Sequence, residues 1–207
     1  MSTESVDGFL DRLADGSPVP GGGAAAGLQA ALGAALVAMA ARCTPPERFP
    51  ESSPLAGEIA RRADTARGLC RDASTADEKA FAQVASAYRL PRDDDEQRQD
   101  RAAAIQEAME RATQPPLDVL EQCERILDLA ERLAPVANPN ALADLATGVE
   151  AVRAACAASR LTVQVNVGSI DDTVVRSRLR SRMGDVDGTL ARLHRLSDTL
   201  SGKVIGS

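Results

Sequence analysis

Hydrophobic residues recur at helical spacing along almost the whole chain. The clearest case is residues 55–90, where small and apolar side chains alternate three and four positions apart and one charged residue, Asp77, falls inside the series. This spacing places every member on one side of a single long helix. The series consists of Ile59, Ala63, Ala66, Cys70, Ala73, Asp77, Ala80, Val84 and Ala87.

Two further helices are expected before this one. A short amphipathic helix carries Val6, Phe9, Leu10 and Leu13 on one side. After a proline- and glycine-rich junction, residues 24–41 form a helix of small side chains that ends before the next pair of prolines.

The second half of the chain continues in the same way. A helical stretch follows the acidic run at residues 93–96 and extends to residue 133, with a kink at Pro115 and Pro116, which lack backbone donors. Further helices are expected over residues 141–159 and 172–200. The segment between them, LTVQVNVGSIDD, alternates like a strand but has no second strand to pair with, so we predict helix or irregular structure. The pattern as a whole predicts an all-α, long-helix antiparallel bundle in a single domain of residues 1–207.

Composition shows what kind of core this bundle has. Hydrophobic residues make up 44% of the chain, but aromatic residues only 2%, with no Trp. The interior must therefore be built from Ala, Leu, Val and Gly, which favours helices whose backbones approach closely. Gly23, Gly27, Ala31 and Ala35 form such a ridge. Residues 24–41 are long enough for a membrane span, but Ala, Gly and Gln29 give a small transfer energy, so we expect a buried helix instead.

Several classes of function are disfavoured. The net charge of −6 and the scarcity of aromatic residues argue against a nucleic-acid partner. The first residues lack the pattern of a signal peptide, which predicts a cytoplasmic protein with no membrane partner. Without a CxxC pair, and with His194 as the only histidine, neither a metal site nor a Ser-His-Asp triad is expected. Three cysteines lie on apolar helical stripes and are predicted to pack in the core, namely Cys70, Cys123 and Cys156.

The junction before the small-residue helix is the first candidate for chemistry. Its sequence is SPVPGGG, residues 17–23. Unpaired N–H groups and the positive end of the dipole at a helix start can hold a carboxylate or a carbonyl oxygen. A tight structural turn explains the same residues equally simply.

Two aspartates interrupt otherwise apolar helix faces. Asp77 lies on the seam described above, and Asp144 lies on a face of small residues together with Gly148 and Ala155. A carboxylate among apolar neighbours has a raised pKa, as a general acid or base requires. The alternatives are a helix cap or an arginine ion pair for Asp77, and a first-turn acid favoured by the helix dipole for Asp144.

Four segments, in order, resemble the cyclodeaminase/cyclohydrolase family, which includes methenyltetrahydrofolate cyclohydrolases and the cyclodeaminase part of formiminotransferase-cyclodeaminase. The likeness covers most of the chain between Phe9 and Asp172. The segments are FLDRLADGSPVPGGGAAAGLQAALGAALVAMAA, DEKAFAQVASAYRLPR, RAAAIQEAMERATQPPL and NPNALADLATGVEAVRAACAASRLTVQVNVGSIDD.

The resemblance implies an all-helical homodimer with its folate pocket near the glycine junction and the subunit interface. It implies that Asp144 or Asp77 is the base or stabilises the cationic substrate, and that folate is a substrate rather than a cofactor. Three positions depart from the family pattern, because Ala24, Ala143 and Thr162 replace residues that are commonly Ser, Ser and Asn. The substrate-binding residues implied are Ser17, Pro20, Gly21, Gly22, Gly23, Asn138 and Asn166.

Three functions remain open at this point. The favoured one is hydrolysis of 5,10-methenyltetrahydrofolate to 10-formyltetrahydrofolate, which needs a positioned water and a base. The second is cyclisation of formiminotetrahydrofolate with release of ammonia, in much the same pocket. The third is a non-catalytic helical dimer that binds a folate or serves as a scaffold, which the three departures favour.

Overall fold

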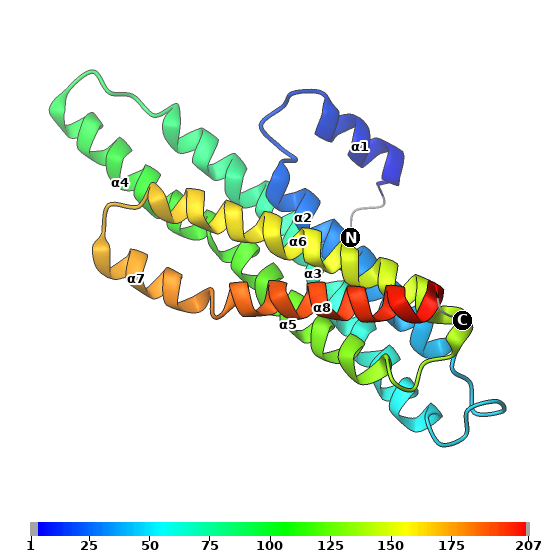
Figure 1. Cartoon of the computed structure of the whole chain (residues 1–207). Helices are drawn as coiled ribbons and strands as arrows, with labels where there is room; N and C mark the ends of the chain where they lie inside the picture. The colour runs from blue at the N-terminus through cyan, green and yellow to red at the C-terminus, as the bar shows by residue number, and fades with distance from the viewer. Residues whose placement is uncertain (1–3, 206–207) are drawn as a thin grey trace.

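The computed structural model describes residues 4–205 and confirms the all-α prediction, since these residues contain helices and no strand (Figure 1). The prediction that the first residues do not form a signal peptide includes residues 1–3, which lie outside the described part. The elements are α1 (Val6–Ala14), α2 (Gly22–Arg42), α3 (Ser53–Tyr88), α4 (Asp95–Ala112), α5 (Gln114–Leu133), the 3-10 turn η1 (Pro139–Ala141), α6 (Leu142–Gly168), α7 (Thr173–Arg182) and α8 (Val186–Ile205).

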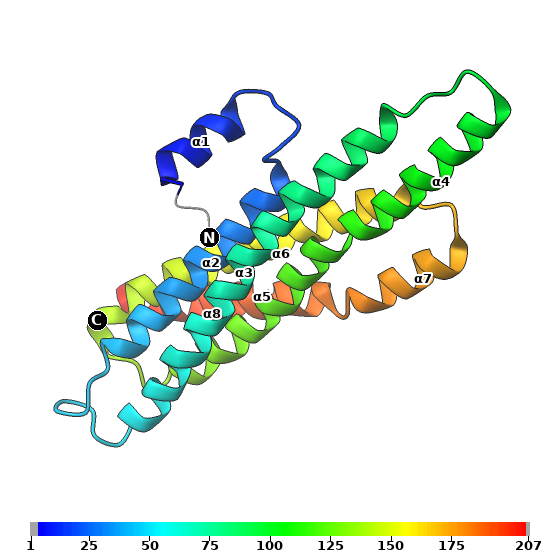
Figure 2. The same cartoon turned by 180° about the vertical axis from the view of Figure 1, so that it is seen from behind.

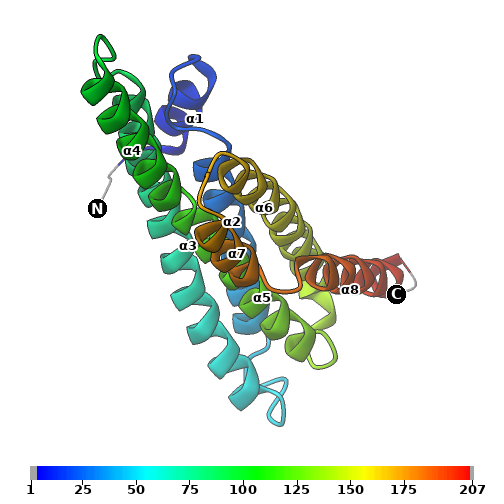
Figure 3. The same cartoon turned by 90° about the vertical axis from the view of Figure 1, so that its left-hand side faces the viewer.

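The centre of the molecule is a bundle of α2, α3, α5 and α6. Seen from behind, α2 and α3 lie side by side along their length (Figure 2). Helix α8 covers α5 and α6 at the edge farthest from α3 (Figure 3). The core is aliphatic, as the composition predicts, and the three cysteines expected in it are buried.

Glycines allow α2 to approach its neighbours closely. A Cβ at Gly33 would lie 2.4 Å from Val152 Cγ2, and a Cβ at Gly148 would lie 2.9 Å from Leu36 Cβ. On its other side α2 meets α3, where a Cβ at Gly27 would lie 2.8 Å from Ser74 Cβ. The pairs Gly33–Val152 and Leu36–Gly148 show that α6 runs antiparallel to α2, and the pairs Gly27–Ser74 and Gly23–Asp77 show the same for α3. By length and composition α2 could cross a membrane, but 56% of its most apolar window is buried inside the protein.

Pro115 and Pro116 separate α4 from α5, whereas the sequence predicted a kink at this point within one continuous helix. Because Pro116 has no N–H, the carbonyl of Ala112 cannot accept the usual helical hydrogen bond. The side-chain amide of Asn166 donates to that carbonyl instead, at 3.0 Å. Asn166 lies in α6. This helix is longer than the sequence predicted, because it includes the segment LTVQVNV and continues to Gly168 rather than ending at residue 159.

The prediction of one helix over residues 172–200 is wrong. Gly184 has a φ of 63°, a conformation that glycine adopts without strain, and it separates α7 from α8. Asp185 then accepts a hydrogen bond from the Gly188 N–H at 2.9 Å and so caps α8. The apolar stripe continues across the break, since Leu179, Val186 and Leu193 are all buried.

Helix α1 stands apart from the bundle beside the start of α2 (Figure 1). Only part of its predicted apolar side is covered, because Phe9 is buried whereas Val6 is 76% and Leu10 is 52% exposed. Arg12 connects α1 to the bundle through an ion pair with Glu78 of α3 at 2.9 Å.

Candidate functional site

The glycine junction forms the start of α2. The Val19–Pro20 peptide bond is cis, Pro20 is buried, and Gly21 occupies the N-cap position with an extended backbone. Gly21 has no side chain to cap the helix. The first N–H groups of α2 therefore need partners from elsewhere in the protein.

Asp77 of α3 supplies one of these partners. Its carboxylate accepts a hydrogen bond from the Ala24 N–H and lies directly against Gly23. A Cβ at Gly23 would be only 2.2 Å from Asp77 Oδ1, so only glycine at this position leaves room for the carboxylate. The structure thus shows Asp77 as the cap of a neighbouring helix, one of the alternatives considered above.

The electrostatic environment of Asp77 differs from that of an ordinary cap. Burial raises the pKa of this carboxyl to about 6, and the negative charge of Glu78 adds to the increase. The hydrogen bond from Ala24 opposes them but does not cancel them. A carboxyl with this pKa can exchange protons near neutral pH, which a simple surface cap cannot do.

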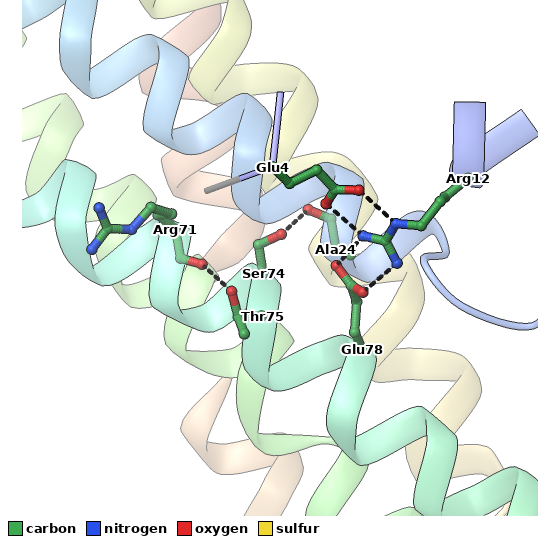
Figure 4. Close-up of polar contacts among 7 residues, drawn as sticks. All are labelled: Glu4, Arg12, Ala24, Arg71, Ser74, Thr75 and Glu78. Carbon is green, nitrogen blue, oxygen red and sulfur yellow. Dashed lines mark hydrogen bonds and ion pairs between the residues drawn. The ribbon is translucent and has the colours of Figure 1, made fainter. Parts of the chain in front are cut away.

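Ser74 holds the same turn of α2 from one helical turn earlier in α3. Its hydroxyl, which is buried, donates to the Ala24 carbonyl at 2.8 Å (Figure 4). Ala24 is therefore bound to α3 through both its N–H and its carbonyl. Sequence reasoning missed Ser74, although its position three residues before Asp77 places both side chains on one face.

A cleft of about 640 Å³ opens beside this turn, between α1, α2 and α3. Arg12 lines this cleft and donates hydrogen bonds to Glu4 and Glu78 (Figure 4). Asp77 itself is not part of the cleft wall, but the residues on both sides of it, Ala76 and Glu78, are. Phe9 and Leu28 give the cleft an apolar part, and its charged lining is mixed, with Arg12, Arg71 and Lys79 beside Glu4, Asp72 and Glu78.

Two of the predicted site residues, Asp144 and Asn138, lie at the end of the bundle opposite Asp77. Gly148 packs against Leu36, so Asp144, one turn earlier in α6, is level with the end of α2. At 1.5 Å per residue this is about 24 Å from Ala24 along the helix. Asn138 is at this end as well, where its amide donates to the Cys43 carbonyl at 2.8 Å and its Oδ1 accepts from the Asn140 N–H. One protomer does not bring Asp77 and Asp144 together.

Other predicted residues lie at the Asp77 end but make structural contacts there. Asn166 holds the Ala112 carbonyl, as described above. Ser17 is exposed and its N–H donates to Asp15 at 2.6 Å. Among the positions that depart from the family pattern, Ala24 is fully buried, and Thr162 donates its hydroxyl to the Ala158 carbonyl at 3.1 Å. The binding roles of these residues stay predictions.

The sequence profile of the family described as formiminotransferase-cyclodeaminase matches residues 5–185. The chain belongs to this family. The match includes α1, the glycine junction, Asp77 and Asp144, so this formiminotransferase-cyclodeaminase family member contains both candidate carboxylates within the shared region. No group of three or more His, Cys, Asp or Glu side chains in residues 4–205 is arranged to hold a metal ion.

Individual relatives show which proteins the family member is similar to. It is 34% identical to a methenyltetrahydrofolate cyclohydrolase of Methylorubrum extorquens over 97% of this chain and 98% of that protein. It is 28% identical to mouse formimidoyltransferase-cyclodeaminase, covering 88% of this chain but only 34% of the longer mouse protein. Its fold matches the crystal structure of formiminotetrahydrofolate cyclodeaminase from Thermotoga maritima with a TM-score of 0.82 at 23% identity, over 99% of this chain and 97% of the other.

Proposed function

We propose that this protein hydrolyses 5,10-methenyltetrahydrofolate to 10-formyltetrahydrofolate. The observation that carries the proposal is the Asp77 carboxylate, with a pKa raised to about 6, held against Gly23 at the start of α2. The similarity to a cyclohydrolase over nearly the full length of both proteins supports the choice of reaction.

The substrate needs little activation, because its methenyl carbon is bonded to two nitrogens that share a positive charge. Water adds to this carbon and loses one proton to the Asp77 carboxylate. Asp77 then passes this proton to N5 as the bond from the carbon to N5 breaks, and the added hydroxyl loses its remaining proton and becomes the formyl carbonyl on N10. One proton is released in the balanced reaction. A base with a pKa near 6 is ionised at neutral pH and passes the proton on readily.

The start of α2 favours the same step. The positive end of a helix dipole disfavours the cationic substrate relative to the neutral adduct, in which negative charge develops on the added oxygen. The cleft next to Asp77 offers apolar walls at Phe9 and Leu28 for the aromatic part of a folate. It also offers Lys79, and Arg71 where its ion pair with Asp72 opens, for the glutamyl carboxylates.

The proposal includes a homodimer formed through α2 and α6. Helix α2 carries no charged side chain before Arg42 at its end, and Leu32 of α2 and Leu161 and Val165 of α6 are 60–62% exposed. Large exposed apolar side chains on two neighbouring helices favour an interface. A two-fold axis across the middle of α2 would set it antiparallel to its copy and bring the partner's Asp144 beside this protomer's Gly22. Each site would then contain both aspartates, one from each protomer.

Cyclisation of formiminotetrahydrofolate with loss of ammonia is the second candidate. The observation that favours it is the same raised pKa, since a carboxyl that is partly protonated near pH 6 can donate the proton that ammonia needs in order to leave. The long relatives with cyclodeaminase names agree with this alternative.

The decisive experiment follows the methenyl absorbance of purified protein mixed with 5,10-methenyltetrahydrofolate at mildly acidic pH, where spontaneous opening is slow. Loss of absorbance above the buffer rate, abolished by Asp77→Asn, supports the hydrolase. If the protein leaves methenyltetrahydrofolate unaffected but converts formiminotetrahydrofolate to methenyltetrahydrofolate with release of ammonia, the cyclodeaminase function replaces the hydrolase function. If the folded protein binds folate and accelerates neither reaction, Asp77 is a structural cap and the non-catalytic function holds.

A further inference from the structure

Two cysteines from adjacent helices meet inside the bundle, away from the site described above. Cys123 of α5 and Cys156 of α6 are 0% and 1% exposed, and their thiols are hydrogen-bonded to each other. They are 33 residues apart in sequence, so the fold alone creates the pair. Cys70 of α3 lies close to Cys123 as well, but no hydrogen bond joins them.

A small cleft gives access to one member of the pair. It has a volume of about 80 Å³ and lies where the α7–α8 turn, around Gly184, crosses α5 and α6. Cys156 contributes to its wall, whereas Cys123 and Cys70 do not. A water molecule occupies about 30 Å³ in the liquid, so the cleft has room for a molecule as small as hydrogen peroxide.

The surroundings make the two thiols unequal. The hydrogen bond from Cys123 and the nearby positive charge of Arg160 lower the pKa of Cys156, against the opposing effects of burial and Glu124. The same hydrogen bond and complete burial raise the pKa of Cys123. Burial also raises the pKa of Cys70 to about 12. Because Cys156 also lines the cleft and Cys123 does not, Cys156 is the member of the pair that a small oxidant reaches first; the lowered pKa favours its nucleophilic thiolate form.

We propose that Cys156 reacts with hydroperoxides and that Cys123 resolves the product as an intramolecular disulfide between α5 and α6. The Cys156 thiolate attacks one peroxide oxygen, giving a sulfenic acid and releasing hydroxide. The Cys123 sulfur then attacks the Cys156 sulfur, the S–O bond breaks, and water leaves with the Cys123 proton. Peroxide is reduced, and the two thiols are oxidised to one disulfide. The proposal does not depend on the folate reaction.

The test treats the folded full-length protein with hydrogen peroxide, alkylates the remaining thiols and digests the product with trypsin. Cleavage after arginine places the four cysteines on four different peptides, CTPPER, GLCR, ATQPPLDVLEQCER and AACAASR. We expect a disulfide-linked product of the last two peptides that disappears on reduction. Recovery of both as alkylated thiols, or linkage of Cys123 to Cys70 instead, would overturn the proposal.

A variant separates the two steps. In Cys123→Ala the resolving thiol is absent, so the sulfenic acid should persist, and dimedone added together with denaturant after the peroxide should label Cys156 at least ten times more than in the wild type. Cys70→Ala is the matched control, because it removes a neighbouring buried thiol that has no part in the reaction, and its labelling should equal that of the wild type. Equal labelling in all three proteins would contradict the assigned order. If Cys123→Ala does not fold, the peptide map of the wild type decides alone.

Discussion

Asp77 occupies the space that any side chain at Gly23 would need. The two residues lie on antiparallel helices, and a Cβ at Gly23 would stand 2.2 Å from Asp77 Oδ1 and 2.6 Å from Oδ2. The glycine run and the aspartate, which are 54 positions apart in the sequence, are therefore one structural unit. The absence of a side chain at Gly23 is what allows a carboxylate to reach the first turn of α2.

We expect Gly23→Ala to reduce activity by at least about tenfold and stability by roughly 1–3 kcal/mol, because the added methyl displaces the carboxylate from a close-packed turn. Steady-state kinetics and urea unfolding measure the two effects. The control is Gly68→Ala in α3, where a Cβ meets nothing within 4 Å. That variant should be slightly more stable and fully active, since alanine favours helix. An active Gly23→Ala enzyme would show that the carboxylate is not needed at this position.

Replacing Asp77 by Asn removes the base but keeps an oxygen that can accept from Ala24. We expect kcat to fall by about 10²–10⁴-fold while the fold is retained. In the wild type, kcat/KM should rise with pH up to about 6 and then level off, because only the ionised carboxylate accepts a proton. Rate measurements corrected for the buffer reaction test both. A wild-type profile that is flat between pH 5 and 7 would assign the base to another group.

The raised pKa also has a consequence for stability. The folded protein binds the Asp77 proton more tightly than the unfolded chain, whose aspartate carboxyl has a pKa near its ordinary value of 3.8. Raising the pH from about 4 to above 6 should therefore lower the free energy of unfolding, by roughly 1–3 kcal/mol from this group. Denaturation of the wild type and Asp77→Asn across this range isolates the effect. As the pH rises, the free energy of unfolding of the wild type should fall relative to that of Asp77→Asn. A difference that stays constant with pH would contradict the raised pKa of Asp77.

The proposed dimer predicts complementation between two inactive variants. Asp77→Asn and Asp144→Asn each inactivate both sites of a homodimer. If every site takes one aspartate from each protomer, a mixed dimer has one intact site. Random exchange of subunits should then restore about a quarter of the wild-type activity. The two variants are mixed, dissociated and allowed to reassociate, and the activity of the mixture is then measured. Each variant taken alone through the same steps is the control. No recovery in a verified mixed dimer would mean that the two aspartates do not share a site across the interface.

Asn166 is expected to stabilise the break between α4 and α5. Asn166→Leu leaves the buried Ala112 carbonyl without its donor, which typically costs about 1–3 kcal/mol. Urea unfolding monitors the loss. Gln164→Leu, at an exposed position of the same helix, should change stability by less than about 0.5 kcal/mol. Similar effects for the two variants would exclude this structural role.

Helical periodicity was sufficient to predict most of the fold. The seam through Ile59, Cys70 and Val84 is buried as its spacing predicts, because a long amphipathic helix has one stable way to cover its apolar side. The break at Gly184 was missed, since the apolar stripe continues across it and a lone glycine is tolerated within a helix.

The candidate site could be predicted only in part. Local sequence identified the glycine junction and the aspartate on an apolar seam. It could not show that Asp77 meets Gly23, nor that Asp144 lies at the other end of the protomer, because both facts depend on the antiparallel packing of three helices. Ser74 and Arg12 carried no distinctive signal, since one resembles any small helical residue and the other any surface charge.

The attachment of α1 makes the cleft sensitive to ionic strength. Phe9 is the one residue of this helix that is buried, and Arg12 holds the helix to Glu78 through a partly exposed ion pair. Such pairs are weakened by salt, as the screening distance falls from about 10 Å at 0.1 M to about 3 Å at 1 M. Salt therefore loosens the one wall of the cleft that does not belong to the bundle, and leaves the aliphatic core behind it unchanged.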